Sequence, residues 1–381
     1  MSIPSFFSMY QQLIATPSIS SMDPGWDHSN KGVIDLLATW LEALGFQCEI
    51  NELENKPGKY NLLARRGTGA GGLLLSGHTD TVPYDAQRWS LDPFQLTEKD
   101  NRWYGLGSID MKGFFAFIIE VLKNLPSAAQ QKPLMILATA DEETTMDGAR
   151  QLSMFNNLKP DTCIIGEPTS MRPVCAHKGH LSEAIRVIGR SGHSSDPKLG
   201  INAIEVMHQV IGKLLQVQSE FSHNYSSPMF AVPEPTLNLG SIHGGDNPNR
   251  ICGCCELQID VRPLPGMAID DLYGIIDRHL TELKQQTEAQ IEWLHLHEPI
   301  PGFEQTTDAA LVKLAEKVSQ QASQAVNYCT EAPFLQALGC QTIVMGPGSI
   351  NQAHQPDEFL SMDSIDSSKK TIESLIRALC F

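Results

Sequence analysis

The chain contains four short apolar runs that are too continuous for strands with one face in water. Such runs are typical of strands that a sheet buries on both faces. They are Leu73–Leu75, Leu134–Ala140, Thr162–Ile165 and Thr342–Met345. Apolar residues at helical spacing occur around them in Lys31–Leu44, Phe114–Leu125 and Ala309–Val318. Alternating strands and helices predict an α/β fold, with a mostly parallel sheet and helices on both of its faces.

The middle of the chain has a different pattern, which begins with an alternating strand at Leu181–Ile188. The next elements are a helix, two strands, a helix and a strand, at Ala203–Val217, Thr236–Ile242, Ile251–Arg262, Asp270–Leu283 and Ile291–His297. The order βαββαβ is that of the split, ferredoxin-like unit. We therefore expect an α+β domain at 179–297, inserted into a larger domain formed by 1–178 and 298–381.

Composition and charge exclude some classes of partner and indicate where the protein is located. The 381 residues include 28 Lys and Arg and 44 Asp and Glu, a net charge of −16, which argues against nucleic acid or an anionic membrane surface as a partner. The apolar stretch Phe114–Leu122 contains Glu120 and is too short to span a bilayer. No basic region precedes an apolar run at the N-terminus, and the nine cysteines follow no framework spacing. These features predict a cytoplasmic protein with free thiols.

Three motifs suggest chemistry that their context does not support. Cys252, Cys254 and Cys255 lack a second cysteine pair for a zinc set, and strand alternation predicts Cys252 and Cys254 on one face and Cys255 on the other. The segment 67–72 has the spelling G-x-G-x-x-G, but it precedes a strand, which favours a turn. His295 and His297 alternate on one strand face, but two ligands without acidic partners nearby make a weak metal case, so we interpret them as ordinary strand residues.

Polar residues that could bind metal follow each of the four apolar runs. The residues that follow them are His78 and Asp80 after the first, Glu142 and Glu143 after the second, Glu167 after the third and His354 after the fourth. Asp110 lies in a Gly-rich turn before a helix. In open parallel sheets, ligands bind beyond the carboxyl ends of the strands, so we expect these side chains to meet in one crevice.

Imidazole and carboxylate groups together are the ligands expected for zinc or a similar divalent ion. A single catalytic zinc normally keeps about three protein ligands, so five candidates fit two ions that share a carboxylate better. One carboxylate would remain to move protons. Each residue alone is more simply explained as a loop or turn residue, but that explanation is improbable for five such placements at strand ends.

Several longer stretches resemble the signature motifs of the co-catalytic di-zinc peptidase and deacylase family, over nearly the whole chain. This family includes succinyl-diaminopimelate desuccinylase, aminoacylase-1 and glutamate carboxypeptidases. The stretches are His78–Pro83, Gly105–Gly113, Asp141–Glu143 and Ile165–Thr169, with further similarity in Leu13–Ser20, Ala176–His180, Asn327–Phe334 and Gly346–Glu358.

The resemblance implies two Zn²⁺ per subunit, with Co²⁺ able to replace them. It implies that Asp110 bridges the ions, that His78 and Glu167 complete one site, and that Glu143 and His354 complete the other. Asp80 would then accept a hydrogen bond from the second ring nitrogen of His78 and fix its tautomer. Glu142 would act as the general base and acid.

The resemblance also implies a homodimer formed through the inserted domain. In this arrangement His193 would reach the active site of the partner subunit and stabilise the oxyanion. Asn249 and Arg262 would hold the substrate carboxylate, for which a guanidinium is well suited. Thr330 and Glu331 are expected to contact the substrate, and Glu331 would face a cationic chain.

The expected reaction is therefore hydrolysis of an N-acetylated amino acid, and the resemblance implies N²-acetyl-L-ornithine as the substrate, in arginine biosynthesis. One alternative is another acyl-amino-acid hydrolase, such as a desuccinylase. A second alternative is a metal-binding homologue without catalytic activity. Loss of a ligand or of the base would indicate that homologue, and the sequence retains all of them.

Overall fold

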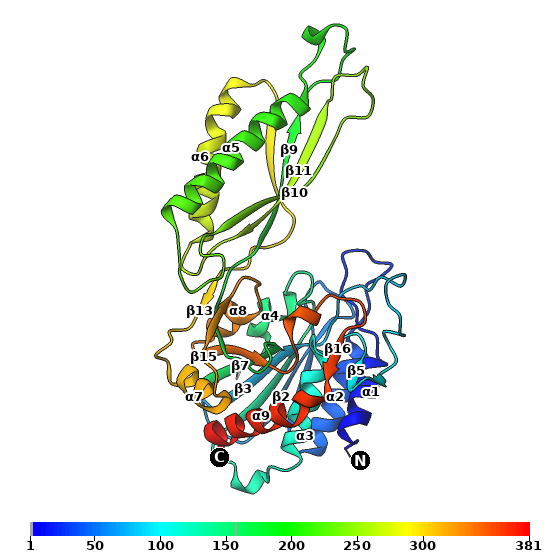
Figure 1. Cartoon of the computed structure of the whole chain (residues 1–381), viewed down its shortest axis with the longest axis vertical. Helices are drawn as coiled ribbons and strands as arrows, with labels where there is room; N and C mark the ends of the chain where they lie inside the picture. Colours follow the sequence, from blue (N-terminus) through cyan, green and yellow to red (C-terminus); the bar gives the residue numbers. More distant parts are fainter. Residues whose placement is uncertain (1–2, 157) are drawn as a thin grey trace. The chain divides into compact units, whose positions relative to one another are not determined.

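The computed structural model describes residues 3–156 and 158–381. Contacts divide the chain into two compact units (Figure 1). Unit 1 comprises Met1–Cys175, Gln305–Gln324 and Thr330–Phe381, and unit 2 comprises Ala176–Glu304 and Ala325–Cys329. The insert expected at 179–297 lies within the residues of unit 2.

The core of unit 1 is a mixed sheet whose central strands are parallel. In spatial order its strands are β1 (Gln47–Glu52), β2 (Tyr60–Arg66), β6 (Leu134–Thr139), β3 (Leu73–His78), β7 (Thr162–Pro168), β15 (Gln341–Gly346) and β8 (Val174–His177). Strand β3 runs parallel to β6 and β7, and β15 runs parallel to β7. The four apolar runs are these four parallel strands, and β3 and β6 are buried along their whole length. The structure confirms the predicted α/β fold and its mostly parallel core.

The helices of unit 1 are α1 (Phe6–Ile14), α2 (Lys31–Ala43), α3 (Lys112–Leu122), α4 (Asp147–Arg150), α7 (Ala310–Ser319), α8 (Ala332–Gln336) and α9 (Ile365–Cys380). Helix α3 packs against α1, α9 and strand β3. Its residues are mostly apolar on every side, and all of them except Glu120 are buried. Short 3₁₀ turns occur at Ser127–Ala129, Leu152–Met154, Pro197–Leu199, Ile350–Gln352 and Met362–Ser364.

A small second sheet lies next to the segment that carries His354. Its strands, in spatial order, are β16 (Phe359–Ser361), β5 (Arg102–Tyr104) and β4 (Thr97–Lys99). Where the chain passes between the units, β13 (Phe303–Glu304) and β14 (Gln324–Val326) both pair with β8. Among the described residues, none of the helices has the length and apolar character needed to cross a membrane.

Unit 2 is a four-stranded antiparallel sheet with two long helices. In sequence order its elements are β9 (Leu181–Ile188), α5 (Ala203–Asn224), β10 (Thr236–Gly244), β11 (Cys254–Arg262), α6 (Ile269–Gln286) and β12 (Gln290–His295). The strands lie in the order β10-β11-β9-β12, and α5 and α6 run side by side over the sheet (Figure 1). The predicted βαββαβ order is confirmed.

One detail of the predicted strand faces is wrong. Strand β11 begins at Cys254, so Cys252 precedes the strand and does not follow its alternation. Cys252 and Cys255 are both buried in the core of unit 2, whereas Cys254 is exposed.

Candidate metal centre

The strand ends of unit 1 bring the predicted ligands together. His78 is the last residue of β3, Glu167 lies near the end of β7, and Glu143 follows β6 in a turn. Asp110 precedes α3, and His354 lies between β15 and β16. Because β3, β6 and β7 are parallel, their carboxyl ends deliver these side chains to the same edge of the sheet.

These five side chains form two groups of three that share Asp110. One group is His78, Asp110 and Glu167, and the other is Asp110, Glu143 and His354; within each group the ligand atoms lie within 4.8 Å of one another. The two carboxylate oxygens of Asp110 face different imidazoles. Oδ1 is 3.2 Å from His78 Nε2, and Oδ2 is 3.5 Å from His354 Nε2. This is the arrangement that a bridging carboxylate requires.

The remaining contacts complete each group. His78 Nε2 is 3.8 Å from Glu167 Oε1, and His354 Nε2 is 3.0 Å from Glu143 Oε2. Glu142 forms a third group with His78 and Glu143. Its carboxylate is therefore adjacent to both of the groups that share Asp110.

The electrostatics of these residues fit bound cations. Burial raises the pKa of Glu142 and of Glu167 well above the usual range, and repulsion from neighbouring carboxylates adds to both increases. The hydrogen bond to Glu143 raises the pKa of His354 to about 9. Divalent cations favour the charged carboxylates and offset this repulsion. Since two imidazoles and several carboxylates are also the donors that zinc and similar ions prefer, the residues present fit a pair of divalent ions.

Asp80 holds the turn that carries Glu142 and Glu143. Its carboxylate accepts hydrogen bonds from the backbone N–H of Glu142 at 3.3 Å and of Glu143 at 3.1 Å. The sequence analysis expected this carboxylate to bond with His78. His78 Nδ1 is 3.0 Å from the backbone oxygen of Asp80, and it forms an ion pair with Oδ1 of the Asp80 carboxylate at 3.6 Å, so this carboxylate faces both the imidazole and the turn.

Glu358 supports the bridging residue, a role that the sequence analysis did not predict. Its buried carboxylate accepts hydrogen bonds from the backbone N–H groups of Gly107, Ile109 and Asp110 at 2.8–3.2 Å. Burial raises the pKa of Glu358 to about 7. Glu358 lies about 250 residues from this loop in sequence, so the only sequence signal was its place at the end of Gly346–Glu358, a stretch that resembles the family.

Thr330 and Glu331 are buried at the start of α8. The Thr330 hydroxyl accepts a hydrogen bond from the backbone N–H of Ala332, and Thr139 donates a hydrogen bond to Glu331 Oε2 at 3.0 Å. Burial raises the pKa of Glu331 to about 7. Its other oxygen, Oε1, is buried with no hydrogen-bond partner among the described residues.

The other three predicted site residues belong to unit 2. His193 and Asn249 lie in adjacent loops, since Ser194 N–H donates to the Asn249 carbonyl at 3.1 Å. The His193 ring is exposed, and its Nδ1 is 2.7 Å from Ser195 Oγ. Arg262, at the end of β11, donates through Nε to Asp260 at 2.9 Å.

Two motifs that the sequence analysis set aside can now be placed. The segment 67–72 connects β2 to β3 and has positive φ at Gly67, Gly69, Gly71 and Gly72, which confirms a turn. The statement that His295 lacks an acidic partner is wrong. Glu183 lies opposite His295 on the neighbouring strand, and its carboxylate is 2.8 Å from His295 Nδ1.

The fold and the paired groups define a class of hydrolase. The chain matches the model of peptidase family M20/M25/M40 over residues 74–378, and it belongs to this family. It is 57% identical to acetylornithine deacetylase of Vibrio vulnificus (strain CMCP6), a match that covers the whole of both chains. It is 55% identical over 378 residues to acetylornithine deacetylase of Edwardsiella ictaluri (strain 93-146), covering 99% of this chain and 98% of the relative.

Solved structures share the fold at much lower identity. An M20 family metallo-carboxypeptidase from Sulfolobus solfataricus is similar with a TM-score of 0.78 and 18% identity, covering 98% of this chain and 99% of that one. A tripeptidase from Staphylococcus aureus has a TM-score of 0.77, also at 18% identity, over 98% and 97% of the two chains. These likenesses concern the fold alone.

Proposed function

We propose that this chain is an amide hydrolase that converts N²-acetyl-L-ornithine to L-ornithine and acetate in arginine biosynthesis. The observation that carries the proposal is the pair of ligand groups that share Asp110, with Glu142 beside them. The substrate follows from the relatives at 55–57% identity, which are named acetylornithine deacetylase. They do not favour a desuccinylase, and the presence of the base and the complete ligand set disfavours a homologue without activity.

The two groups are proposed to hold two zinc ions per subunit, which cobalt can replace. His78, Asp110 and Glu167 would hold one ion, and Asp110, Glu143 and His354 the other. Zinc supplies a Lewis acid and lowers the pKa of a bound water from about 15.7 to about 7.

Glu142 is proposed to move the proton. Its carboxylate accepts a proton from the attacking water and delivers it to the leaving amine nitrogen. Burial raises the pKa of Glu142 above the usual range of a carboxylic acid, which makes its carboxylate a stronger proton acceptor. Asp80 keeps this carboxylate in place through the backbone of residues 142 and 143.

The five remaining predicted residues are proposed to bind the substrate. Arg262 and Asn249 would bind the substrate carboxylate, and His193 would donate a hydrogen bond to the acyl oxygen as negative charge develops on it. Thr330 and Glu331 would contact the substrate chain. Among the residues that the structure describes, Glu331 Oε1 has no hydrogen-bond partner, which supports a role in binding the cationic side chain of ornithine, since a buried carboxylate oxygen without a donor is costly.

We also propose a homodimer formed by unit 2 and a cytoplasmic location. Strand β10 is an edge of the unit 2 sheet, with pairing groups available for a second copy. Ile242 on this strand and Ile204 on α5 are about half exposed, which supports an apolar contact there. The nine cysteines are free thiols, which is compatible with a reducing compartment.

The assignment is tested by comparing N²-acetyl-L-ornithine with succinyl-diaminopimelate at equal concentration. We expect faster hydrolysis of the acetyl substrate, loss of activity after chelation, and recovery with zinc or cobalt. Faster hydrolysis of the succinyl substrate would reassign the enzyme. Full activity in a preparation verified to be free of metal would contradict the mechanism.

A further inference from the structure

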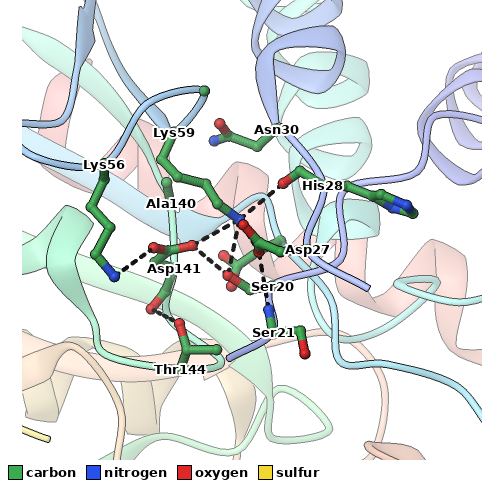
Figure 2. A network of polar contacts seen from close by, with 12 residues as sticks. Ser20, Ser21, Asp27, His28, Asn30, Lys56, Lys59, Ala140, Asp141 and Thr144 are labelled. Atoms are coloured by element: carbon green, nitrogen blue, oxygen red, sulfur yellow. Dashed lines mark hydrogen bonds and ion pairs between the residues drawn. The ribbon is translucent and has the colours of Figure 1, made fainter. Parts of the chain in front are cut away.

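Lys59 is a buried cation beside the metal centre to which the mechanism above gives no role. It immediately precedes β2, and only 3% of its surface is exposed. Figure 2 shows its ammonium group between the segment that carries Ser20, Asp27 and His28 and the turn that carries Asp141. It donates to Asp27 Oδ1 at 2.7 Å, to the His28 carbonyl at 2.9 Å and to Ser20 Oγ at 3.3 Å, and it forms an ion pair with Asp141 Oδ1 at 3.0 Å.

Asp141 is the first residue of the turn that follows β6. Its carboxylate is buried and also accepts a hydrogen bond from the Ser20 hydroxyl (Figure 2). Its backbone carbonyl accepts hydrogen bonds from the N–H groups of Thr145 at 3.1 Å and Met146 at 2.7 Å. Asp141 has a φ of +59°, in the left-handed region that few non-glycine residues adopt. The side chain and the backbone are therefore both held in place at this residue.

The next two residues along the chain are Glu142 and Glu143. Their N–H groups are bound by Asp80 from the β3 side, as described above. The turn is thus held by two contacts: Asp80 binds the N–H groups of its second and third residues, and Lys59 forms an ion pair with the side chain of its first residue, Asp141. Loss of either contact would leave the direction of the Glu142 and Glu143 carboxylates less defined.

We propose that Lys59 is a positioning residue for the hydrolytic reaction: its ion pair with Asp141 sets the turn that aims Glu142 at the substrate and Glu143 at the metal. The charge matters because the Asp141 carboxylate is buried, and because the carboxylates of Asp27 and Asp147 bind the same two lysines as Asp141 does. A neutral side chain at position 59 would leave Asp141 without its closest cation, and a buried carboxylate without a partner is unfavourable. This inference rests on the proposed function for the roles of Glu142 and Glu143.

Lys56 provides a matched control in the same cluster. Its ammonium group also faces Asp141, but at 3.6 Å, and it is closer to Asp147 at 2.9 Å. Its side chain is 36% exposed, against 4% for Lys59. Both lysines lie in the connection between β1 and β2, so the same substitution at each separates the buried ion pair from a general loss of positive charge.

The experiment compares Lys59→Met, Lys56→Met and Asp141→Asn in the metal-loaded full chain. For Lys59→Met we expect kcat for N²-acetyl-L-ornithine to fall at least about tenfold with KM within about threefold, since a misaligned base slows the chemical step. Asp141→Asn, which keeps the side-chain shape, should show the same pattern and replaces Lys59→Met if that variant does not fold. Lys56→Met should stay within about threefold of the wild type in both constants.

Two further measurements separate positioning from stability. With cobalt in place of zinc, the visible absorption spectrum should change in Lys59→Met and remain that of the wild type in Lys56→Met, because Glu143 is a proposed ligand. Thermal unfolding then reports how much of each variant is folded at the assay temperature. The proposal would be overturned if kcat for Lys59→Met and for Asp141→Asn lay within threefold of kcat for Lys56→Met. It would also be overturned if the loss of kcat in these variants matched their unfolded fraction while the cobalt spectrum stayed unchanged.

The same experiment distinguishes this inference from the proposed function. If the wild type hydrolyses neither acyl substrate, the proposed function fails, and the cobalt spectra alone decide whether Lys59 orients Glu143. If the wild type is active and both lysine variants behave alike, only the role of Lys59 fails.

Discussion

At the scale of single residues, two carboxylates bind the backbone of the loops that carry the acidic groups of the site. Asp80 binds the N–H groups of the turn that carries Glu142 and Glu143, and Glu358 binds those of the loop that carries Asp110. Bonds of this kind, between a charged oxygen and an N–H group, are among the stronger hydrogen bonds in proteins. The backbone that carries Asp110, Glu142 and Glu143 is thus held by residues outside the proposed ligand set.

The first prediction concerns Glu142. Glu142→Gln removes the proton acceptor but keeps the shape of the side chain, so kcat should fall by about 10²–10⁴-fold. The metal content, measured by elemental analysis, should stay at the wild-type level because Glu142 is not among the proposed ligands. Turnover at the wild-type rate in this variant would remove Glu142 from the mechanism.

The ligands could be predicted from the sequence, but their supports could not. A His or Glu at the end of an apolar run has a position that the strand itself defines, as for His78 and Glu167. Glu358 and Lys59 act on loops far away in the sequence, and nothing in their local pattern indicates the partner. The Asp80 carboxylate likewise binds a turn 62 residues away, which its local pattern does not indicate.

At the scale of elements, the site depends on close packing between α3 and the parallel strands that carry its ligands. Gly166 on β7 lies against the ring of Phe114, near the start of α3, and directly precedes Glu167. A Cβ added at Gly166 would be 2.1 Å from Phe114 Cδ1, closer than atoms can approach. The absence of a side chain at residue 166 therefore allows the helix to sit on the strand that carries a ligand.

Gly166→Ala should lower the free energy of unfolding by about 1–3 kcal/mol, the usual cost of overpacking a core. Gly274→Ala serves as a control, because Gly274 lies on α6 with nothing within 4 Å of an added Cβ. That change should leave stability unchanged or raise it by about 0.5–1 kcal/mol through helix propensity. Equal effects in denaturant unfolding would show that the contact with Phe114 does not matter.

The elements with strong patterns were the ones that the sequence could predict. The four apolar strands, α2, α3 and the order of unit 2 all appear in the structure. The analysis did not predict α1, β1, β2 or α9. Within the described part of the chain, strand β1 pairs only with β2, and it is largely exposed, so its sequence has little apolar pattern. Helix α9 is amphipathic, and its polar face interrupts the apolar residues that pack inward.

At the scale of the whole molecule, the chain combines two units whose sequences carry different kinds of information. In unit 1, the His and Glu residues that follow the apolar strands indicated a metal centre from physical reasoning alone. In unit 2, the pattern predicted the fold, but the roles of His193, Asn249 and Arg262 came only from family resemblance. Their proposed functions concern the substrate and a second subunit, which the pattern of a single chain does not contain.

The central claim is that His78, Asp110, Glu143, Glu167 and His354 hold a pair of cations. Anomalous diffraction from zinc-loaded crystals tests it most directly. We expect two peaks per chain, one on each side of Asp110 and about 3.5–4 Å apart, as in other two-metal sites. Peaks elsewhere on the chain, or none beside Asp110 in a protein that is active and loaded with zinc, would contradict the account.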